Sequence, residues 1–315
     1  MSASERSGQI AVPAAHSDQL QRFLFEGFPV RGHLVHLDAA WRALIEHHDY
    51  PRVVRDTLGE ATAAAVLMVA TLKFEGVLTL QLQGPGPMHL LVAHCTDRHA
   101  VRGVARWHTA PEGPELARLT GGGQLTVTVD KTDQSGRYQG VVPLTGARIA
   151  DCLEDYFRRS EQLPTRLWLA ATPERVAGLL LQRLPHGARA SAEADTRLAE
   201  DGDEHWNRVL HLAGTLTAPE LLDLPSATLL RRMFHEEDLR LFEPAPVYFQ
   251  CTCSRARVER ILRALGRREA EEVLAERGDV EVRCEFCNRS YRFDAVDVAE
   301  LFASEAPAPH SPGRH

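Results

Sequence analysis

The stretch CTCSRARVERILRALGRREAEEVLAERGDVEVRCEFC, residues 251–287, decides how the C-terminal part of the chain folds. It holds four of the six cysteines, arranged as one C-x-C pair and one C-x-x-C pair. Zinc prefers four soft or borderline ligands in a tetrahedron, and cysteine thiolates suit it well. The spacing therefore predicts a metal centre for one zinc ion, with four ligands: Cys251, Cys253, Cys284 and Cys287.

The residues around the cysteines predict a small zinc-binding module over 250–303. Residues two apart in an extended strand point to the same face, so the sulfurs of Cys251 and Cys253 can converge. Ser254 and Asp294 are placed to cap two helices. The first helix is expected to bury an apolar stripe made of Val258, Ile261, Leu262 and Leu265. A module of about 50 residues is too small to depend on its core alone.

Two plainer interpretations of the four cysteines stay open at this point. They can be buried thiols without a metal, although paired spacing on both sides of the segment argues against this. They can also hold a purely structural zinc ion. Four cysteine ligands would fill the tetrahedron and leave no open position for a water or a substrate, so a hydrolytic zinc site is disfavoured.

The response to oxidation distinguishes a redox switch from a purely structural zinc site. Each cysteine pair can close a very small ring when its thiolates are oxidised, and oxidised sulfur no longer binds zinc. Structural zinc contributes on the order of 10–16 kcal/mol to the folding of small modules, whereas tiny disulfide loops restrict the unfolded chain only slightly. The module is therefore expected to unfold on oxidation, and the acidic segment that precedes it is expected to loosen as well. This would create a redox-gated apolar binding surface.

Composition limits the function classes. The chain has 315 residues, 44% of them apolar and 25% charged, as in an ordinary globular protein. Its net charge of −7 argues against a polyanion-binding protein. The longest uncharged apolar run, residues 61–72, is too short to span a bilayer, and the N-terminus lacks the features of a secretory signal. We expect a cytoplasmic, reducing location, where clustered cysteines favour metal binding or redox chemistry over structural disulfides.

The chain is expected to have an α+β fold with an antiparallel sheet in its large N-terminal domain. Five parts are predicted: a flexible N-terminal extension (1–18), an α+β core domain with an apolar binding surface (19–190), a helical, marginally stable, redox-sensitive linker (191–249), the four-cysteine domain (250–303) and a disordered tail (304–315). Within the core domain, periodicity predicts strands over 21–37 and 165–172, helices over 39–51, 55–75 and 147–160, and hairpins over 76–95 and 121–144.

The predicted linker, 191–249, has a composition of its own. It carries twelve acidic and five basic side chains, a net charge of −7, and no cysteine or lysine. Helical patches over 205–216 and 226–242 alternate with polar stretches and prolines. The apolar faces of these patches need a surface to pack on. We therefore expect an ordered but marginal segment that lies against the core domain.

Long segments of the chain resemble one known family. The matching segments are PVRGHLVHLDAAW (29–41), HHDYPRVVRDTLGEATAAAVLMVATLKFEGVLTLQLQGPGP (47–87), YQGVVPLTG (138–146), CLEDYFRRSEQLPTRLWLA (152–170), FHEEDLRLFEP (234–244), CTCSRARVERIL (251–262) and CEFCNRSYRFDAVDVAELF (284–302). In these segments the sequence resembles the 33-kDa heat-shock protein family, the bacterial redox-regulated holdase chaperones.

The resemblance implies a mechanism without catalytic residues. The reduced protein would bind one zinc ion through the four cysteines and be inactive. Peroxide or hypochlorous acid, under unfolding conditions, would form two disulfides, Cys251–Cys253 and Cys284–Cys287. Zinc release and linker unfolding would follow, and the protein would dimerise and hold unfolding or oxidatively damaged clients without ATP. The sequence agrees on the last point because it contains no phosphate-binding loop, and TGGGQL (120–125) is interpreted as a hairpin turn.

Two rival functions remain as alternatives. A zinc-ribbon nucleic-acid binder would need a basic patch, but residues 251–303 hold ten Arg against eleven Asp or Glu. A thiol oxidoreductase normally places its C-x-x-C at the start of a helix, and here the motif lies between a strand and NRSYRF. Cys95 and Cys152 are expected to be buried core thiols. Leu241, Phe242 and the pair Leu229–Leu230 are expected to pack against the core domain in the resting state.

Overall fold

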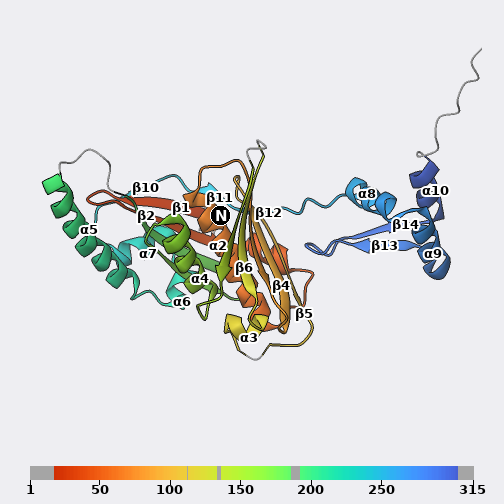
Figure 1. Ribbon diagram of the computed structural model, residues 1–315, viewed down its shortest axis with the longest axis horizontal. Helices are drawn as coiled ribbons and strands as arrows, with labels where there is room; N and C mark the ends of the chain where they lie inside the picture. Colours follow the sequence, from red (N-terminus) through yellow and green to blue (C-terminus); the bar gives the residue numbers. More distant parts are fainter. Residues whose placement is uncertain (1–17, 112, 133–135, 186–191, 304–315) are drawn as a thin grey trace, which may run out of the picture. The chain divides into compact units, whose positions relative to one another are not determined.

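The computed structural model shows an α+β protein, as the sequence predicts (Figure 1). It describes residues 18–111, 113–132, 136–185 and 192–303, and for 192–202 the backbone alone. The predicted N-terminal extension, apart from Asp18, and the predicted tail over 304–315 lie outside these residues. The chain divides into two compact units, with the boundary between Gln250 and Cys251. Among the described residues, no helix combines the length and apolarity needed to cross a bilayer.

The first unit contains a six-stranded antiparallel sheet, here called sheet A, in the order β10-β1-β2-β9-β8 with β11 beside β1. Its strands are β1 (Gln19–Phe25), β2 (Val30–Leu37), β8 (Thr165–Ala171), β9 (Val176–Arg183), β10 (Leu239–Leu241) and β11 (Ala245–Pro246). The single strand expected over 21–37 is instead the β1–β2 hairpin. Gly27 and Pro29 interrupt the strand pattern there, as these residues do in turns.

The second six-stranded sheet of this unit, sheet B, has the order β12-β5-β4-β3-β6-β7. Its strands are β3 (Gly76–Gln83), β4 (Met88–Thr96), β5 (Ala100–Trp107), β6 (Gln124–Lys131), β7 (Arg137–Pro143) and β12 (Tyr248–Phe249). The β3–β4 and β6–β7 hairpins confirm the two predicted hairpins. TGGGQL does not form a hairpin turn: Gly121, at φ 66°, ends α3 (Leu116–Thr120), and the chain then enters β6.

The long helix α2 (Arg52–Thr71) fills the main core between the two sheets. Its alanines at 61 and 63–65 are at most 1% exposed, and their small side chains let strands from both sheets approach closely. The helix begins directly after Pro51, which also follows the short helix α1 (Ala39–Ile45). The helix expected over 147–160 is α4 (Ile149–Tyr156), continued by the π-helical turn η1 (Phe157–Glu161).

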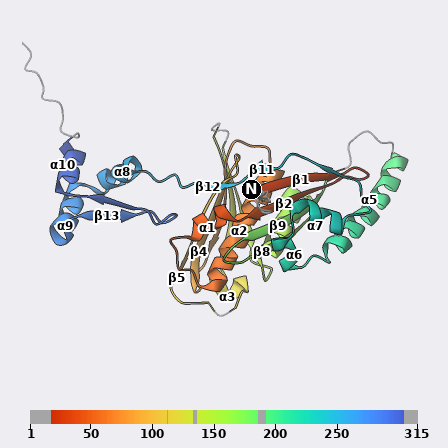
Figure 2. The same cartoon turned by 180° about the vertical axis from the view of Figure 1, so that it is seen from behind.

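Three helices from the predicted linker cover the other face of sheet A (Figure 2). They are α5 (Ala192–Ala213), α6 (Ala218–Asp223) and α7 (Ser226–Met233). The helical patch expected over 226–242 ends early, at Met233. Residues after it pair with β1 as strand β10, so a long-range partner overrides the local helical pattern.

The second unit is a small module with its own apolar core. Its elements are α8 (Arg255–Leu265), α9 (Arg267–Arg277), β13 (Val280–Arg283), β14 (Ser290–Phe293) and α10 (Ala295–Ala303). Ser254 Oγ accepts from Arg257 N, and Asp294 Oδ1 accepts from the amides of Val296 and Asp297, which confirms both predicted helix caps.

The apolar stripe predicted on the first helix of this module is only half correct. Val258 and Leu262 are buried, but Ile261 and Leu265 are 57% and 54% exposed. The two buried positions lie four residues apart and face the β13–β14 hairpin and α10 through a common core. A narrow helix face therefore satisfies this small core.

Candidate metal centre

The four cysteines of the second unit converge on one point. Their sulfur atoms all lie within 4.8 Å of one another. Two of the contacts are 3.6 Å between Cys251 and Cys284, and 3.4 Å between Cys253 and Cys287. Each of these short distances joins the C-x-C pair to the C-x-x-C pair, so the cluster fastens two segments that are far apart in the sequence.

The first pair does not lie in a strand, contrary to the prediction from its spacing. Strand β12 ends at Phe249, and the residues from Gln250 to Ser254 have no regular secondary structure. The chain turns here because Ser254 begins helix α8 by accepting a hydrogen bond from its first turn. Cys251 and Cys253 therefore reach the cluster from an irregular segment before a helix.

The second pair occupies the tight connection between β13 and β14. The amide of Cys284 donates to Arg289 O at 2.9 Å, and the amide of Asn288 donates to Cys284 O at 2.8 Å. Asn288 has a left-handed backbone with φ 52°, a conformation that Asn tolerates better than most residues. This turn brings the sulfurs of Cys284 and Cys287 to the same side of the hairpin.

The cluster fits a tetrahedral metal ion. A zinc ion with metal–sulfur bonds of about 2.3 Å implies sulfur–sulfur distances of about 3.8 Å. The observed distances of 3.4 and 3.6 Å, with all sulfurs within 4.8 Å, are close to that geometry. All four donors are soft sulfur atoms, which favours a thiophilic ion. The residues present can therefore hold a metal ion, and four protein ligands would complete its shell.

Tyr291 is a contributor that the sequence analysis missed. Its hydroxyl donates to Cys253 Sγ at 3.1 Å from strand β14. Burial opposes ionisation of Cys253, but hydrogen bonds from Tyr291 and from the neighbouring thiols together lower the pKa of Cys253 to about 7. The sequence offers one signal, the position of Tyr291 four residues after Cys287. This spacing points to the cluster only when the β13–β14 hairpin, in which Tyr291 pairs with Val282, is known.

The other two cysteines take no part in the cluster. Cys95 in β4 and Cys152 in α4 are both completely buried in the main core of the first unit, as predicted. Burial raises the pKa of both thiols. Both thiols are completely shielded from solvent, whereas the four clustered cysteines are only partly buried and therefore more accessible to an oxidant or a metal ion.

The first unit carries an apolar face that the linker helices cover. Phe23, Phe25 and Leu34 of sheet A form one side of this cluster, and the helices supply buried partners from the other side. Phe234, at the end of α7, is 1% exposed and meets Phe25 edge to face at 5.1 Å. We call this surface the aromatic face; its sheet residues are Phe23, Phe25, Val30, Leu34, Ala170, Ala177, Leu179 and Leu181.

The burial predicted for four apolar residues of the linker is confirmed for two of them and wrong for the other two. Leu229 and Leu230 are buried against the aromatic face, as predicted. Leu241 and Phe242 were expected to be packed as well, but they are 46% and 36% exposed. They follow the chain into edge strand β10 and beyond, where a residue has sheet neighbours on one side only.

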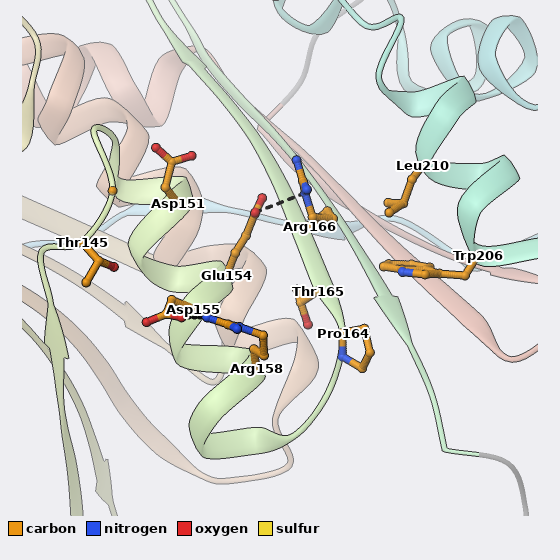
Figure 3. A pocket seen from close by; sticks show the side chains of 11 residues that line it. Thr145, Asp151, Glu154, Asp155, Arg158, Pro164, Thr165, Arg166, Trp206 and Leu210 are labelled. Atoms are coloured by element: carbon orange, nitrogen blue, oxygen red, sulfur yellow. Dashed lines mark hydrogen bonds and ion pairs between the residues drawn. The ribbon is translucent and has the colours of Figure 1, made fainter. Parts of the chain in front are cut away.

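A cavity of about 500 Å³ lies between α4, strand β8 and helix α5 (Figure 3). On one side Glu154 forms an ion pair with Arg166 at 3.1 Å and accepts from the amide of Leu167 at 2.8 Å. Trp206 and Leu210 of α5 line the opposite side. The cavity therefore exists only while α5 stays in place. The ion pair engages the charges of Glu154 and Arg166 with each other.

Comparisons with known proteins place the chain in a family. The family model described as "Hsp33 protein" matches residues 18–294. A 33 kDa chaperonin of Nitrosococcus oceani is 48% identical, covering 95% of this chain and 99% of the relative. The 33 kDa chaperonin of Azotobacter vinelandii is also 48% identical over 95% of this chain and 99% of its own length. A Pseudomonas aeruginosa 33 kDa chaperonin is 44% identical over 96% of this chain.

A solved structure supports the fold independently. The crystal structure of the 33 kDa chaperonin from Thermotoga maritima matches with a TM-score of 0.77 and 23% identity, covering 92% of this chain and all of that chain. The fold, the four-cysteine cluster and the full-length sequence relatives agree with one another. This chain belongs to the Hsp33 family of chaperones.

Proposed function

We propose that the protein is a redox-regulated, ATP-independent holdase that binds unfolding and oxidatively damaged proteins and prevents their aggregation. The observation that carries this proposal is the convergence of four cysteine sulfurs within 4.8 Å in a small module. That module follows the linker, whose helices cover the aromatic face in the first unit and whose last strand, β12, ends at Phe249. A chemical change at the cysteines can thereby be coupled to exposure of an apolar surface.

In the reduced state, Cys251, Cys253, Cys284 and Cys287 would hold one zinc ion. The bound ion would supply folding free energy to the module by tying the segment before α8 to the β13–β14 turn. The fully buried part of the module core is small, with eight side chains that include Val258, Leu262 and Phe293. Such a core needs an additional constraint. We infer that the reduced, metal-bound protein is the inactive state.

Oxidation would remove the ligands. In each disulfide, two thiols lose two electrons and two protons, and hydrogen peroxide accepts them and becomes two molecules of water. We propose the pairs Cys251–Cys253 and Cys284–Cys287. Two short sulfur–sulfur contacts in the folded module cross between the pairs, but partners two or three residues apart remain close when the module unfolds. Sulfurs joined in disulfides no longer serve as thiolate ligands.

Loss of the module would then release the linker. Strand β12 ends at Phe249, two residues before Cys251, and pairs with β5 of sheet B, so we propose that unfolding of the module spreads into the linker through this strand. The linker helices are short or polar on their outer faces and need the aromatic face for stability. Their departure would uncover this face, whose phenylalanines and aliphatic side chains suit the exposed apolar segments of unfolding clients.

We further propose that the oxidised protein is a homodimer and that it works in the cytoplasm. A reducing compartment keeps the cysteines as thiols until an oxidant appears. The proposal requires no nucleotide and no catalytic residue. Nucleic acid and membrane are not among its proposed partners.

The proposal is tested by treating the reduced protein with peroxide at mildly elevated temperature. Metal release is followed with a chromogenic chelator, and aggregation of an unfolding client is followed by light scattering. We expect metal release and suppression of scattering to rise together. Oxidised, metal-free protein that leaves aggregation unchanged would sink the assignment. Turnover in an insulin-reduction assay would instead support the oxidoreductase alternative.

A further inference from the structure

The corner between α6 and α7 is attached to sheet A by polar bonds in addition to apolar packing. His36 of β2 is 4% exposed and faces the linker helices. Its Nε2 lies 2.9 Å from Leu221 O in α6, and its Nδ1 lies 3.3 Å from Ser226 Oγ at the start of α7. A carbonyl oxygen can only accept, so Nε2 carries the proton and Nδ1 accepts from the Ser226 hydroxyl.

Arg175 holds the same corner from the turn between β8 and β9. Its Nη1 donates to Asp223 Oδ1 at 2.9 Å and lies 3.5 Å from Leu222 O. Its Nε is 3.8 Å from Asp38 Oδ1, which keeps the guanidinium group oriented. The carbonyl groups of the last helical turn have no partners within a helix. His36 and Arg175 therefore satisfy the end of α6 from two places in sheet A.

We propose that His36 and Arg175 are positioning residues that form a latch, which keeps the α6–α7 corner over the aromatic face. The latch atoms all belong to the first unit and none to the cysteine cluster. Breaking the latch should therefore open the corner without oxidation and without metal loss. The expected effect of this opening on client binding rests on the proposed function.

The burial of His36 sets the size of the effect. Replacing it with leucine keeps most of the side-chain volume but leaves Leu221 O and the Ser226 hydroxyl without this partner. A buried group that loses its hydrogen-bond partner typically shifts an equilibrium by about tenfold or more. Arg175 is more exposed, at 31% of its side chain, so its loss should have a smaller effect because water screens the ion pair.

The chain offers a matched control on the same strand. His33 is also 4% exposed, but it points to the opposite face of sheet A, toward the main core. Neither of its ring nitrogens has a hydrogen-bond partner among the described residues. His33→Leu therefore changes the same residue type in the same strand without touching the latch. His36→Gln is the conservative variant, because its amide can still donate to Leu221 O.

The test is hydrogen exchange of the full-length, reduced, zinc-loaded protein. We expect His36→Leu to speed exchange over 218–233 by about tenfold, while β2 and β9 keep their protection and the metal content is unchanged. His36→Gln should restore much of the protection, and His33→Leu should leave 218–233 as in the wild type. Arg175→Gln should speed exchange less, because the Arg175 side chain is partly exposed. It provides a second variant if His36→Leu folds poorly.

The outcomes separate the latch from the proposed function. Unchanged exchange over 218–233 in both His36→Leu and Arg175→Gln, or equal opening in His33→Leu, would overturn the latch. Selective opening of this segment supports it, whatever the client assay shows. Light scattering of a client is measured in parallel, with oxidised wild-type protein as the reference. A reference that fails to suppress aggregation counts against the proposed function and leaves the exchange result for the latch standing.

Discussion

The sulfur atoms of Cys253 and Cys287 lie 3.4 Å apart although the residues are 34 positions apart in the sequence. This contact joins the segment before α8 to the β13–β14 turn. A ligand bound by both cysteines would close a loop that contains α8, α9 and β13. The stability of the second unit should therefore depend more on the cysteines than on its apolar core.

Cys284→Ser should remove one ligand from the cluster. A serine hydroxyl is a hard, protonated donor, so we expect zinc affinity to fall by more than about 100-fold, since even outer-shell changes cost about 10–100-fold. Chelator competition measures the affinity, and hydrogen exchange over 255–303 should accelerate in the reduced state. Cys95→Ser is the control, because Cys95 lies in β4 of the first unit. Wild-type exchange in the Cys284 variant would contradict a metal-supported module.

Tyr291→Phe should weaken metal binding without removing a ligand. The Tyr291 hydroxyl donates to Cys253 Sγ at 3.1 Å, and such outer-shell bonds orient ligands and stabilise their charge. We expect about a tenfold loss of zinc affinity in the same competition assay, with an unchanged stoichiometry of one ion. Tyr248→Phe serves as the matched control because Tyr248 is 41% exposed and lies in the first unit. Equal affinities for both variants would show that the hydroxyl is dispensable.

The disulfide pairing can be read from tryptic fragments of the oxidised protein. Trypsin cleavage after Arg240 and Arg255 releases a peptide with Cys251 and Cys253, and cleavage after Arg283 and Arg289 releases a peptide with Cys284 and Cys287. Pairing within the motifs leaves two separate peptides, each lighter by two hydrogens. Pairing along the short distances of the folded cluster would link the two peptides covalently. Mass spectrometry without reduction distinguishes the two results, and we expect separate peptides.

Phe234→Ala should loosen the linker helices in the reduced protein. Phe234 is 1% exposed and contacts Phe25 at 5.1 Å, so its truncation should cost about 3–5 kcal/mol. The expected result is increased binding of an apolar fluorescent dye to reduced, metal-loaded protein. Phe242→Ala provides the comparison because Phe242 is 36% exposed. If the two alanine variants bind the dye equally, the aromatic face does not depend on Phe234 for its cover.

His33 should make the first unit sensitive to acid. Burial, reinforced by the charges of Arg31 and Arg22, lowers the pKa of His33 from 6.5 to about 3. Between these two values the unfolded chain binds a proton and the folded chain does not, so stability is lost as the pH falls. The contribution is about 1.4 kcal/mol per pH unit.

The matching variant is His33→Leu, which cannot titrate. Urea unfolding at pH 7 and pH 5 should show a free energy of unfolding that falls by roughly 2 kcal/mol less in the variant than in the wild type. All other titrating groups are common to both proteins and cancel in the comparison. Parallel losses in the two proteins would mean that His33 is protonated in the folded state.

Several features of the molecule follow from local sequence alone. The C-x-C and C-x-x-C pairs, the caps at Ser254 and Asp294 and the β3–β4 hairpin around GPGP all depend on residues close together in the chain. Cysteine pairs have few alternative uses in a small module, and a turn of glycines and prolines has few alternative conformations. These features could be predicted because the relevant physics acts over a few residues.

Other features depend on partners far away in the sequence. Strands β5 and β9 were missed, and residues 239–241 became a strand because they pair with β1, more than two hundred positions earlier. The exposure of Ile261 and Leu265 likewise reflects how little surface the neighbouring hairpin offers to α8. Local periodicity does not contain this information, since it depends on which surfaces meet.

The sequence by itself determined that four thiols would be available as a metal-binding set and that the fold would mix helices with antiparallel hairpins. Only the tertiary structure decided that sulfurs of different pairs lie 3.4 and 3.6 Å apart, that Tyr291 bonds to Cys253, and that His36 reaches the α6–α7 corner. The physical reason is the same in each case. Residue chemistry is local, whereas a distance between two side chains depends on the folding of the whole chain that connects them.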